Sequence, residues 1–241
     1  MVIIGATSAI AKEVGRIYAS KRWEIFLVAR SKEKMTILEE DFKARGATST
    51  KSMCIDFSQK NNYQDIVDWA GKDGNIDLLL VAHGVLCDQK ACEDSNEIAL
   101  SSFEINFISY MCLLNLFAKK MEAQAKGTIA SISSVAGDRG RQSNYFYGTA
   151  KGALSIYCQG LRNRLYKSNV HVLTIKPGFV KTPMTAELKQ GPLFVEPQLV
   201  AKDICKAIES KKNQLYTPWF WWIIMSIIKL IPETIFKRLK L

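Results

Sequence analysis

The chain contains 241 residues, of which 48% are apolar and 23% carry a charge, a balance that excludes disordered and collagen-like proteins. Lysine and arginine exceed aspartate and glutamate by 33 to 23, and the resulting charge of +10 favours an anionic partner such as nucleic acid, a phosphorylated cofactor or a membrane surface. Six cysteines without a Cys-x-x-Cys pair predict reduced thiols and no metal site. The first residues resemble no secretory signal, which predicts a cytoplasmic location.

Short apolar runs alternate along the chain with longer stretches of helical periodicity. The apolar runs predict buried strands over residues 2–4, 25–29, 51–55, 78–82, 128–132 and 170–175. The stretches between them predict helices over residues 9–20, 32–44, 63–71, 98–123, 147–165 and 198–209. Such an alternation predicts an α/β fold, with a doubly wound, mostly parallel, Rossmann-like sheet in a single domain over residues 1–217.

The first turn of the predicted sheet is Gly5-Ala6-Thr7-Ser8-Ala9-Ile10-Ala11. In doubly wound sheets ligands bind beyond the carboxyl ends of the strands, where this turn leads into a helix N-terminus that attracts pyrophosphate. Gly5 allows the tight turn, and the hydroxyls of Thr7 and Ser8 add hydrogen-bond donors. Ala9 and Ala11 stand where glycines are usual, so a simple small-residue turn remains the alternative interpretation.

The second predicted strand leads into Arg30, Ser31 and Lys32. An acidic residue at this point accepts hydrogen bonds from the ribose of NAD, whereas an arginine suits a 2′-phosphate. The sequence therefore predicts NADP(H) in preference to NAD(H), against the alternative that Arg30 is only solvated. Asp56 and Phe57, after the third strand, are expected at the adenine, although an aspartate here also suits a helix cap.

Ser134 follows the fifth predicted strand, and Tyr147 and Lys151 lie four residues apart on the next helix, so they share one face. A free tyrosine has a pKa near 10 and is a poor acid or base at neutral pH. A lysine ammonium one turn away is expected to lower that pKa, and Ser134 is expected to hold a substrate oxygen. The alternative for the tyrosine–lysine pair is an ordinary helix surface.

With these features the chain resembles the short-chain dehydrogenase/reductase family over residues 1–217. The resemblance is carried by the Gly5 turn, Val81-Ala82-His83-Gly84, Phe103-Glu104-Ile105-Asn106, Ile132-Ser133-Ser134, Tyr147-x-x-x-Lys151 and Lys176-Pro177-Gly178-Phe179-Val180-Lys181-Thr182. It implies that Tyr147 exchanges a proton with the substrate oxygen, that Lys151 holds the nicotinamide ribose, and that Asn106 holds a water in a proton relay. It also implies cofactor contacts from Ile10, Ala82, Gly84, Pro177, Gly178, Val180 and Thr182.

The resemblance is not complete, because the family usually has more glycines in the first turn and Asn-Asn-Ala-Gly where this chain has Val81-Ala82-His83-Gly84. His83 is interpreted as a structural residue of the crevice wall. A catalytically silent nucleotide-binding sensor or scaffold is therefore the alternative to an enzyme. Nucleic acid is not expected as a partner, since no recognised nucleic-acid motif appears.

The turn, the Ser-Ser-Val-Ala-Gly-Asp-Arg-Gly-Arg stretch and the end of the chain are most similar to a bacterial subgroup that includes decaprenylphosphoryl-2-keto-ribose reductase. This likeness implies interconversion of a ketone and a secondary alcohol, with a small-molecule or lipid-linked carbonyl substrate. Arg139 and Arg141 would then meet a phosphodiester at the substrate mouth, with a solvated loop as the alternative. Family members commonly form dimers or tetramers, so a homodimer or homotetramer is expected.

Residues 218–241 depart from the strand–helix pattern. The ten residues before Lys229 are mostly apolar and begin Trp219-Phe220-Trp221-Trp222, and a basic end follows. A stretch of ten is too short to cross a bilayer, which takes about 20 residues. The pattern suits a segment in the headgroup region of an anionic membrane, at its inner face, and the alternative is packing on a sister subunit.

Overall fold

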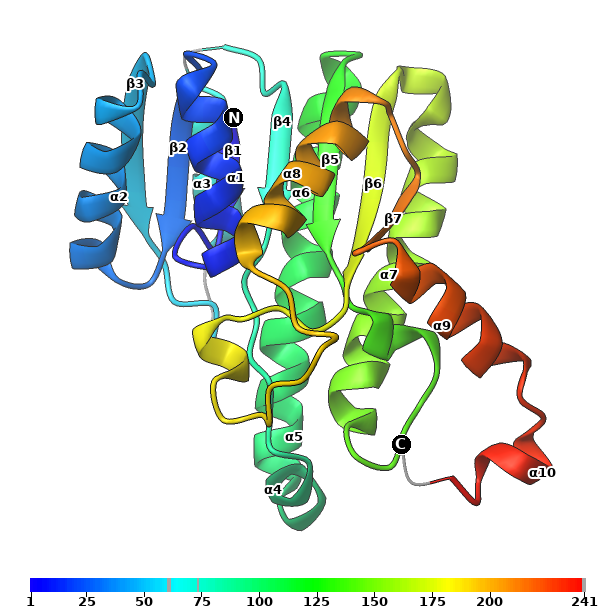
Figure 1. Ribbon diagram of the computed structural model, residues 1–241. Helices are drawn as coiled ribbons and strands as arrows, with labels where there is room; N and C mark the ends of the chain where they lie inside the picture. The colour runs from blue at the N-terminus through cyan, green and yellow to red at the C-terminus, as the bar shows by residue number, and fades with distance from the viewer. Residues whose placement is uncertain (60–61, 73, 240–241) are drawn as a thin grey trace.

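The apolar runs predict strands that are covered by helices on both faces, as in a parallel sheet. In the computed structural model, which describes residues 1–59, 62–72 and 74–239, seven strands form one parallel sheet in the order β3-β2-β1-β4-β5-β6-β7 (Figure 1). The strands are β1 (Val2–Ile4), β2 (Glu24–Ala29), β3 (Ser49–Cys54), β4 (Leu78–Val81), β5 (Gly127–Ile132), β6 (Val170–Pro177) and β7 (Gln214–Thr217). The predicted doubly wound fold is confirmed.

Helices cover both faces of this sheet, and each layer has its own apolar core. The helices α1 (Ala9–Ser20), α2 (Lys32–Ala44) and α8 (Pro197–Glu209) pack on one face. The other face is covered by α3 (Tyr63–Ala70), α6 (Ser109–Ala123) and α7 (Tyr145–Leu165). The carboxyl ends of the strands are thereby left open for a ligand.

The helix predicted over residues 98–123 is divided in the structure. It consists of α5 (Asn96–Phe103), a π-helical turn (Glu104–Ile108) and α6. A short helix that was not predicted, α4 (Gln89–Asp94), precedes it. The run Asn96–Ala123 is long and apolar enough to cross a membrane by length and composition. Tyr110, Leu113 and Phe117 are fully buried against the sheet, however, so packing accounts for this apolar character.

The last part of the chain, from β7 onward, packs on the body of the protein. Strand β7, which the apolar pattern did not predict, adds to the sheet edge and leads into α9 (Phe220–Leu230) and α10 (Glu233–Phe236) (Figure 1). Trp221 and Met225 are buried on the inner side of α9, where they pack with Val135. Residues 240 and 241 of the predicted tail lie outside the described part of the chain.

Candidate active site

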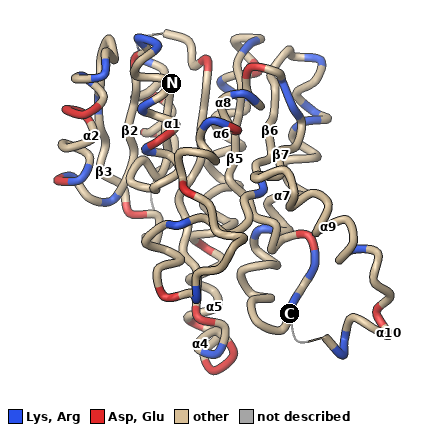
Figure 2. The backbone as a smooth tube through the Cα atoms, viewed as in Figure 1, with Lys and Arg blue, Asp and Glu red and all other residues tan. Residues whose placement is uncertain are grey.

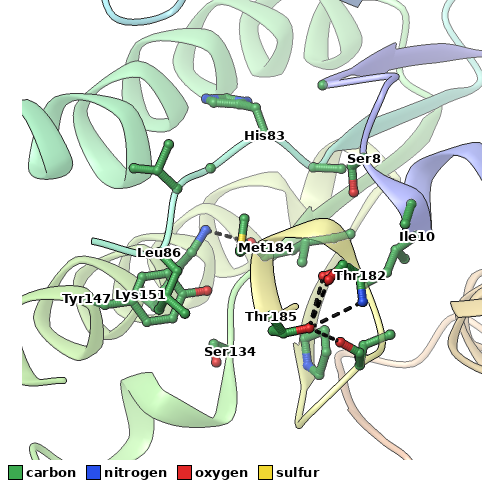
Figure 3. Close-up of a pocket in the computed structure, with 18 of the residues that line it drawn as sticks. Ser8, Ile10, His83, Leu86, Ser134, Tyr147, Lys151, Thr182, Met184 and Thr185 are labelled. Atoms are coloured by element: carbon green, nitrogen blue, oxygen red, sulfur yellow. Dashed lines mark hydrogen bonds between the residues drawn. The ribbon is translucent and has the colours of Figure 1, made fainter. Parts of the chain in front are cut away.

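A cavity of about 440 Å³ opens at the carboxyl ends of the strands. Nearly all residues that the sequence proposes for the cofactor and the reaction line it: Gly5, Thr7, Ser8, Ile10, Arg30, Asp56, Phe57, Ala82, Gly84, Ser134, Tyr147, Lys151, Pro177, Gly178, Val180 and Thr182. Figure 3 shows Tyr147 and Lys151 on one side of this cavity and Ser8 and Ile10 on the other. Two proposed residues, Ser31 and Asn106, are not part of the lining.

The first turn brings the backbone close to the cavity at Gly5. Its φ is +77°, and a Cβ atom built there would lie 2.4 Å from the backbone nitrogen of His83. Only glycine fits such a position. The helix α1 begins directly afterwards, and Ser8 at its N-cap makes no capping hydrogen bond through its side chain. The turn therefore presents free helix N–H groups and a hydroxyl, as a pyrophosphate requires, although Ala9 and Ala11 replace the usual glycines.

His83 fills the wall behind this turn. Its ring is stacked between Phe57 and Tyr110, with ring centres 4.3 and 4.2 Å away, and its Nε2 lies 2.8 Å from the hydroxyl of Ser109. Burial and the nearby Lys151 lower the pKa of His83 well below its ordinary value, so the ring is neutral at pH 7. This packing agrees with a structural position for His83.

Basic side chains gather at the end of β2. Arg30 and Lys34 both line the cavity and are exposed to solvent. Lys34 was not predicted at the cofactor site, because its position depends on the fold: Ser31 caps α2 through the Lys34 N–H, and this cap places Lys34 in the first turn of α2, beside the end of β2. Asp56 accepts hydrogen bonds from the Ser58 N–H at 3.0 Å and from its hydroxyl at 2.8 Å, and these bonds lower the pKa of Asp56.

Ser134 is placed next to α7 by a close backbone approach. It begins the turn Val135–Asp138 and accepts a hydrogen bond from the Ala136 N–H at 3.1 Å. A Cβ atom on Gly148 would lie 2.8 Å from the Ala136 carbonyl oxygen, so a larger residue at 148 would push this turn off α7. The glycine that follows Tyr147 therefore helps to set the separation between Ser134 and the tyrosine.

Tyr147 and Lys151 share one face of α7, and the ammonium nitrogen lies 5.9 Å from the centre of the tyrosine ring. Burial raises the pKa of Tyr147 to about 12, and a hydrogen bond with Ser134 acts in the opposite direction. Burial also lowers the pKa of Lys151 to about 7. The prediction that Lys151 lowers the pKa of Tyr147 is therefore not met in the protein without cofactor. Burial disfavours both the phenolate and the ammonium, and this effect exceeds any stabilisation of one charge by the other.

Asn106 lies one layer behind the cavity, in the π-helical turn, and is fully buried. Its side chain accepts a hydrogen bond from the Val85 N–H at 3.1 Å and donates to the Val85 carbonyl at 3.0 Å and to the Ser102 hydroxyl at 3.2 Å. Lys151 donates to the Ile132 carbonyl at 3.1 Å. In this arrangement Asn106 fixes the loop after β4 that carries Gly84 and Val85.

The remaining wall of the cavity is formed by loops and by the tail. Met184 and Leu188, from the loop that follows β6, line it together with Arg141, Asn144 and Trp221. The two arginines considered for a phosphodiester are separated here. Arg141 faces the cavity, and burial lowers its pKa, whereas Arg139 binds the end of α9.

A buried ion pair supports the turn that carries Ser134. Asp138 at its end accepts a hydrogen bond from Lys176 Nζ at 2.6 Å and another from the Tyr216 hydroxyl at 2.6 Å. The Lys176 and Asp138 side chains are only 6% and 4% exposed. This contact ties the turn to β6 and β7.

A family model described as short chain dehydrogenase matches residues 1–192. The chain belongs to this family. It is therefore an oxidoreductase of the short-chain dehydrogenase type, a family that binds a nicotinamide cofactor, and the residues around Gly5 fit such a cofactor.

Two relatives are similar over most of their length. The chain is 28% identical over 240 residues to an uncharacterized oxidoreductase of Mycobacterium tuberculosis, covering 99% of this chain and 96% of the relative. It is 27% identical over 217 residues to carbonyl reductase family member 4 of Xenopus laevis, covering 86% and 90%. Among solved structures, actinorhodin polyketide ketoreductase with NADPH shares the fold at a TM-score of 0.81 and 20% identity, covering 91% of this chain and 96% of that one.

Proposed function

We propose that this short-chain dehydrogenase is an NADPH-dependent carbonyl reductase that interconverts a ketone and a secondary alcohol. The observation that carries the proposal is that Ser134, Tyr147 and Lys151 line the same cavity as the Gly5 turn. A bound reduced nicotinamide supplies the hydride that goes to the carbonyl carbon. The reductase relative and the ketoreductase with NADPH support this assignment.

Tyr147 is the proton donor to the carbonyl oxygen. Its pKa of about 12 keeps the phenol protonated at neutral pH, which suits an acid that acts on a strongly basic alkoxide. Ser134 hydrogen-bonds the same oxygen and stabilises the negative charge that develops on it. Lys151 in its ammonium form stabilises the phenolate left behind, and the solvent then restores the proton on Tyr147.

The preference for NADPH rests on Arg30 and Lys34. Two cationic side chains at the end of β2 suit a 2′-phosphate better than a pair of ribose hydroxyls. Ser31 contributes to this site through the cap that starts α2. Asp56 and Phe57 form the neighbouring wall, where an adenine ring would lie.

The substrate is proposed to carry an anionic group in addition to its ketone. Arg141 lines the cavity in a partly buried position, and a carboxylate or phosphodiester would satisfy its guanidinium. A lipid-linked keto-sugar phosphate, the substrate type implied by the resemblance to the decaprenylphosphoryl-2-keto-ribose reductase subgroup, has both features. Arg139 is occupied by the tail and takes no part in this binding.

The outer side of α9 supports a peripheral position on the cytoplasmic face of an anionic membrane. Trp219, Trp222 and Leu230 are 71%, 60% and 82% exposed, and basic residues lie at the end of α9 and just after α10 (Figure 2). Interfacial tryptophans beside lysine and arginine are typical of segments that lie in the headgroup region. A Trp219→Ser/Trp222→Ser variant should lose sedimentation with phosphatidylglycerol vesicles. If it sediments like the wild type but shifts from dimer to monomer by light scattering, α9 is a subunit interface.

Turnover of ketones with each nicotinamide cofactor tests the proposal. The wild-type protein should oxidise NADPH when a keto-sugar phosphate or an aryl ketone such as acetophenone is added, and Tyr147→Phe should lower kcat by about 10²–10⁴. NADPH binding, measured by fluorescence titration, should be the same in both proteins. Unaltered turnover in Tyr147→Phe, or binding of NADPH by a wild type that reduces no ketone, would favour the silent sensor instead.

A further inference from the structure

Trp221 is the single residue of α9 that reaches the cavity wall in the described part of the chain. Its side chain is 4% exposed and packs with Val135, the residue after Ser134. The indole packs edge-on against the Phe179 ring, with the two ring centres 5.4 Å apart. A residue from the last helices of the chain thus stands between the serine turn and the loop after β6.

Trp221 also fits against the backbone at Gly178. A Cβ atom built on Gly178 would lie 1.8 Å from Nε1 of Trp221, and the three nearest atoms to it all belong to this indole. Gly178 follows β6 and is one of the residues proposed for the nicotinamide pocket. The ring is therefore placed directly beside the proposed reaction centre, and any side chain at position 178 would displace it.

Arg139 holds the helix that carries this ring. Its guanidinium donates to the carbonyl oxygens of Ile228 and Ile231, both at 2.6 Å, and to Glu233 at 3.0 Å. It also lies 3.8 Å from the centre of the Phe236 ring. A cation at the C-terminal carbonyls of a helix is favourable. Since Arg139 directly follows the turn that begins at Ser134, α9 is fixed to the same turn as the catalytic serine.

Stability alone does not explain a tryptophan at this position. The indole N–H is buried and has no acceptor among the residues that the structure describes. A buried donor without a partner is unfavourable, and a phenylalanine would fill much of the same space without that cost. A role in the cavity, where the large indole lies near Ser134 and Gly178, would account for a tryptophan at this position.

We propose that Trp221 is a specificity-determining residue, which limits the size of the ketone substituent admitted beside Ser134, and that Arg139 is the positioning residue that keeps it there. This inference rests on the proposed reductase function. The inner side of α9 then belongs to the substrate site, whether its outer side contacts a membrane or a sister subunit.

The first experiment measures substrate preference. Trp221→Ala should raise the ratio of kcat/KM for benzophenone over acetophenone by about tenfold or more, because space for one ring opens next to Ser134. The matched control is Trp222→Ala, the neighbouring tryptophan on the same helix, which is 60% exposed and lies outside the lining. It should keep the wild-type ratio. The NADPH dissociation constant should change little in either variant.

Arg139→Gln should give the same shift in preference as Trp221→Ala, because it releases the end of α9. In the Trp221→Ala background it should have no further effect on the ratio. An unchanged ratio in Trp221→Ala, in a protein whose wild type reduces both ketones, would overturn the inference while leaving the proposed function intact. A wild type that binds NADPH and reduces neither these two ketones nor a keto-sugar phosphate would instead count against the proposed function.

A second measurement needs no activity. Gly178→Ala should lower stability in urea in the wild-type background, because its methyl group collides with the indole, and should cost much less in Trp221→Ala. If Gly178→Ala lowers the free energy of unfolding equally in both backgrounds, the Trp221 ring does not lie against Gly178, and the inference fails.

Discussion

The ammonium of Lys151 lies 5.9 Å from the ring centre of Tyr147, and burial moves the two pKa values in opposite directions, to about 7 for the lysine and about 12 for the tyrosine. Both shifts favour the neutral forms. Burying the Lys151 ammonium therefore lowers the stability of the folded protein, and its positive charge is needed only for the reaction. Such a conflict between stability and activity is typical of active sites.

Lys151→Met should abolish ketone reduction and stabilise the protein. The native state binds fewer protons at Lys151 than the unfolded chain does between pH 7 and the ordinary lysine pKa of 10.5, so the wild type gains stability as the pH rises through this range. The variant should be more stable by about 1–2 kcal/mol at pH 6.5. Urea unfolding at pH 6.5 and pH 10 checks this, and the difference should shrink at the higher pH. A destabilised variant at pH 6.5 would contradict the prediction.

The pH dependence of kcat/KM should report Lys151. Since the reaction needs the ammonium form, kcat/KM for ketone reduction should fall about tenfold per pH unit above about pH 7, while Tyr147 stays protonated. Lys151→Arg keeps its charge at these pH values and should show no such fall, whatever its absolute rate. A wild-type profile that is flat from pH 6 to pH 9 would rule out the assigned role of the ammonium.

Arg30→Ala and Lys34→Ala should each weaken NADPH binding by about tenfold to a hundredfold and leave NADH binding nearly unchanged, because each removes a charge-assisted hydrogen bond to the 2′-phosphate. Lys32→Ala provides the control, since Lys32 lies on α2 with Lys34 but outside the cavity lining. Fluorescence titration with both cofactors gives the dissociation constants. Equal losses for NADPH and NADH would mean that these residues do not select the cofactor.

Asp138→Asn should lower the free energy of unfolding by about 3–5 kcal/mol, because it leaves the buried Lys176 ammonium without its counter-charge. The double variant Asp138→Asn/Lys176→Met removes the uncompensated charge and should recover part of this loss. Chemical denaturation compares the three proteins. If the single variant is as stable as the wild type, the pair does not hold the serine turn in place.

Several features of the site were predictable because they depend on neighbouring residues in the chain. Tyr147 and Lys151 are four residues apart on a helix, so their common face follows from helix geometry alone. The apolar runs likewise predicted the inner strands, since a strand covered on both sides must be apolar throughout. Strand β3 was also predicted, over residues 51–55, but as a buried strand, whereas it lies at the sheet edge and Thr50 is its one buried residue. Strand β7 was missed because its four residues, Gln214–Thr217, show no such run.

Other features depend on contacts between distant parts of the chain, and no spacing rule reveals them. Nothing near Trp221 in the sequence indicates that its ring lies on Gly178, and nothing near Arg139 indicates that it binds the end of α9 while Arg141 faces the cavity. The sequence by itself determined the α/β fold, the family and the order of the reacting groups, since these follow from local periodicity and short motifs. Only the tertiary structure decided which side chains are buried together, and with that the pKa shifts and the shape of the substrate site, because burial is a property of the packed molecule.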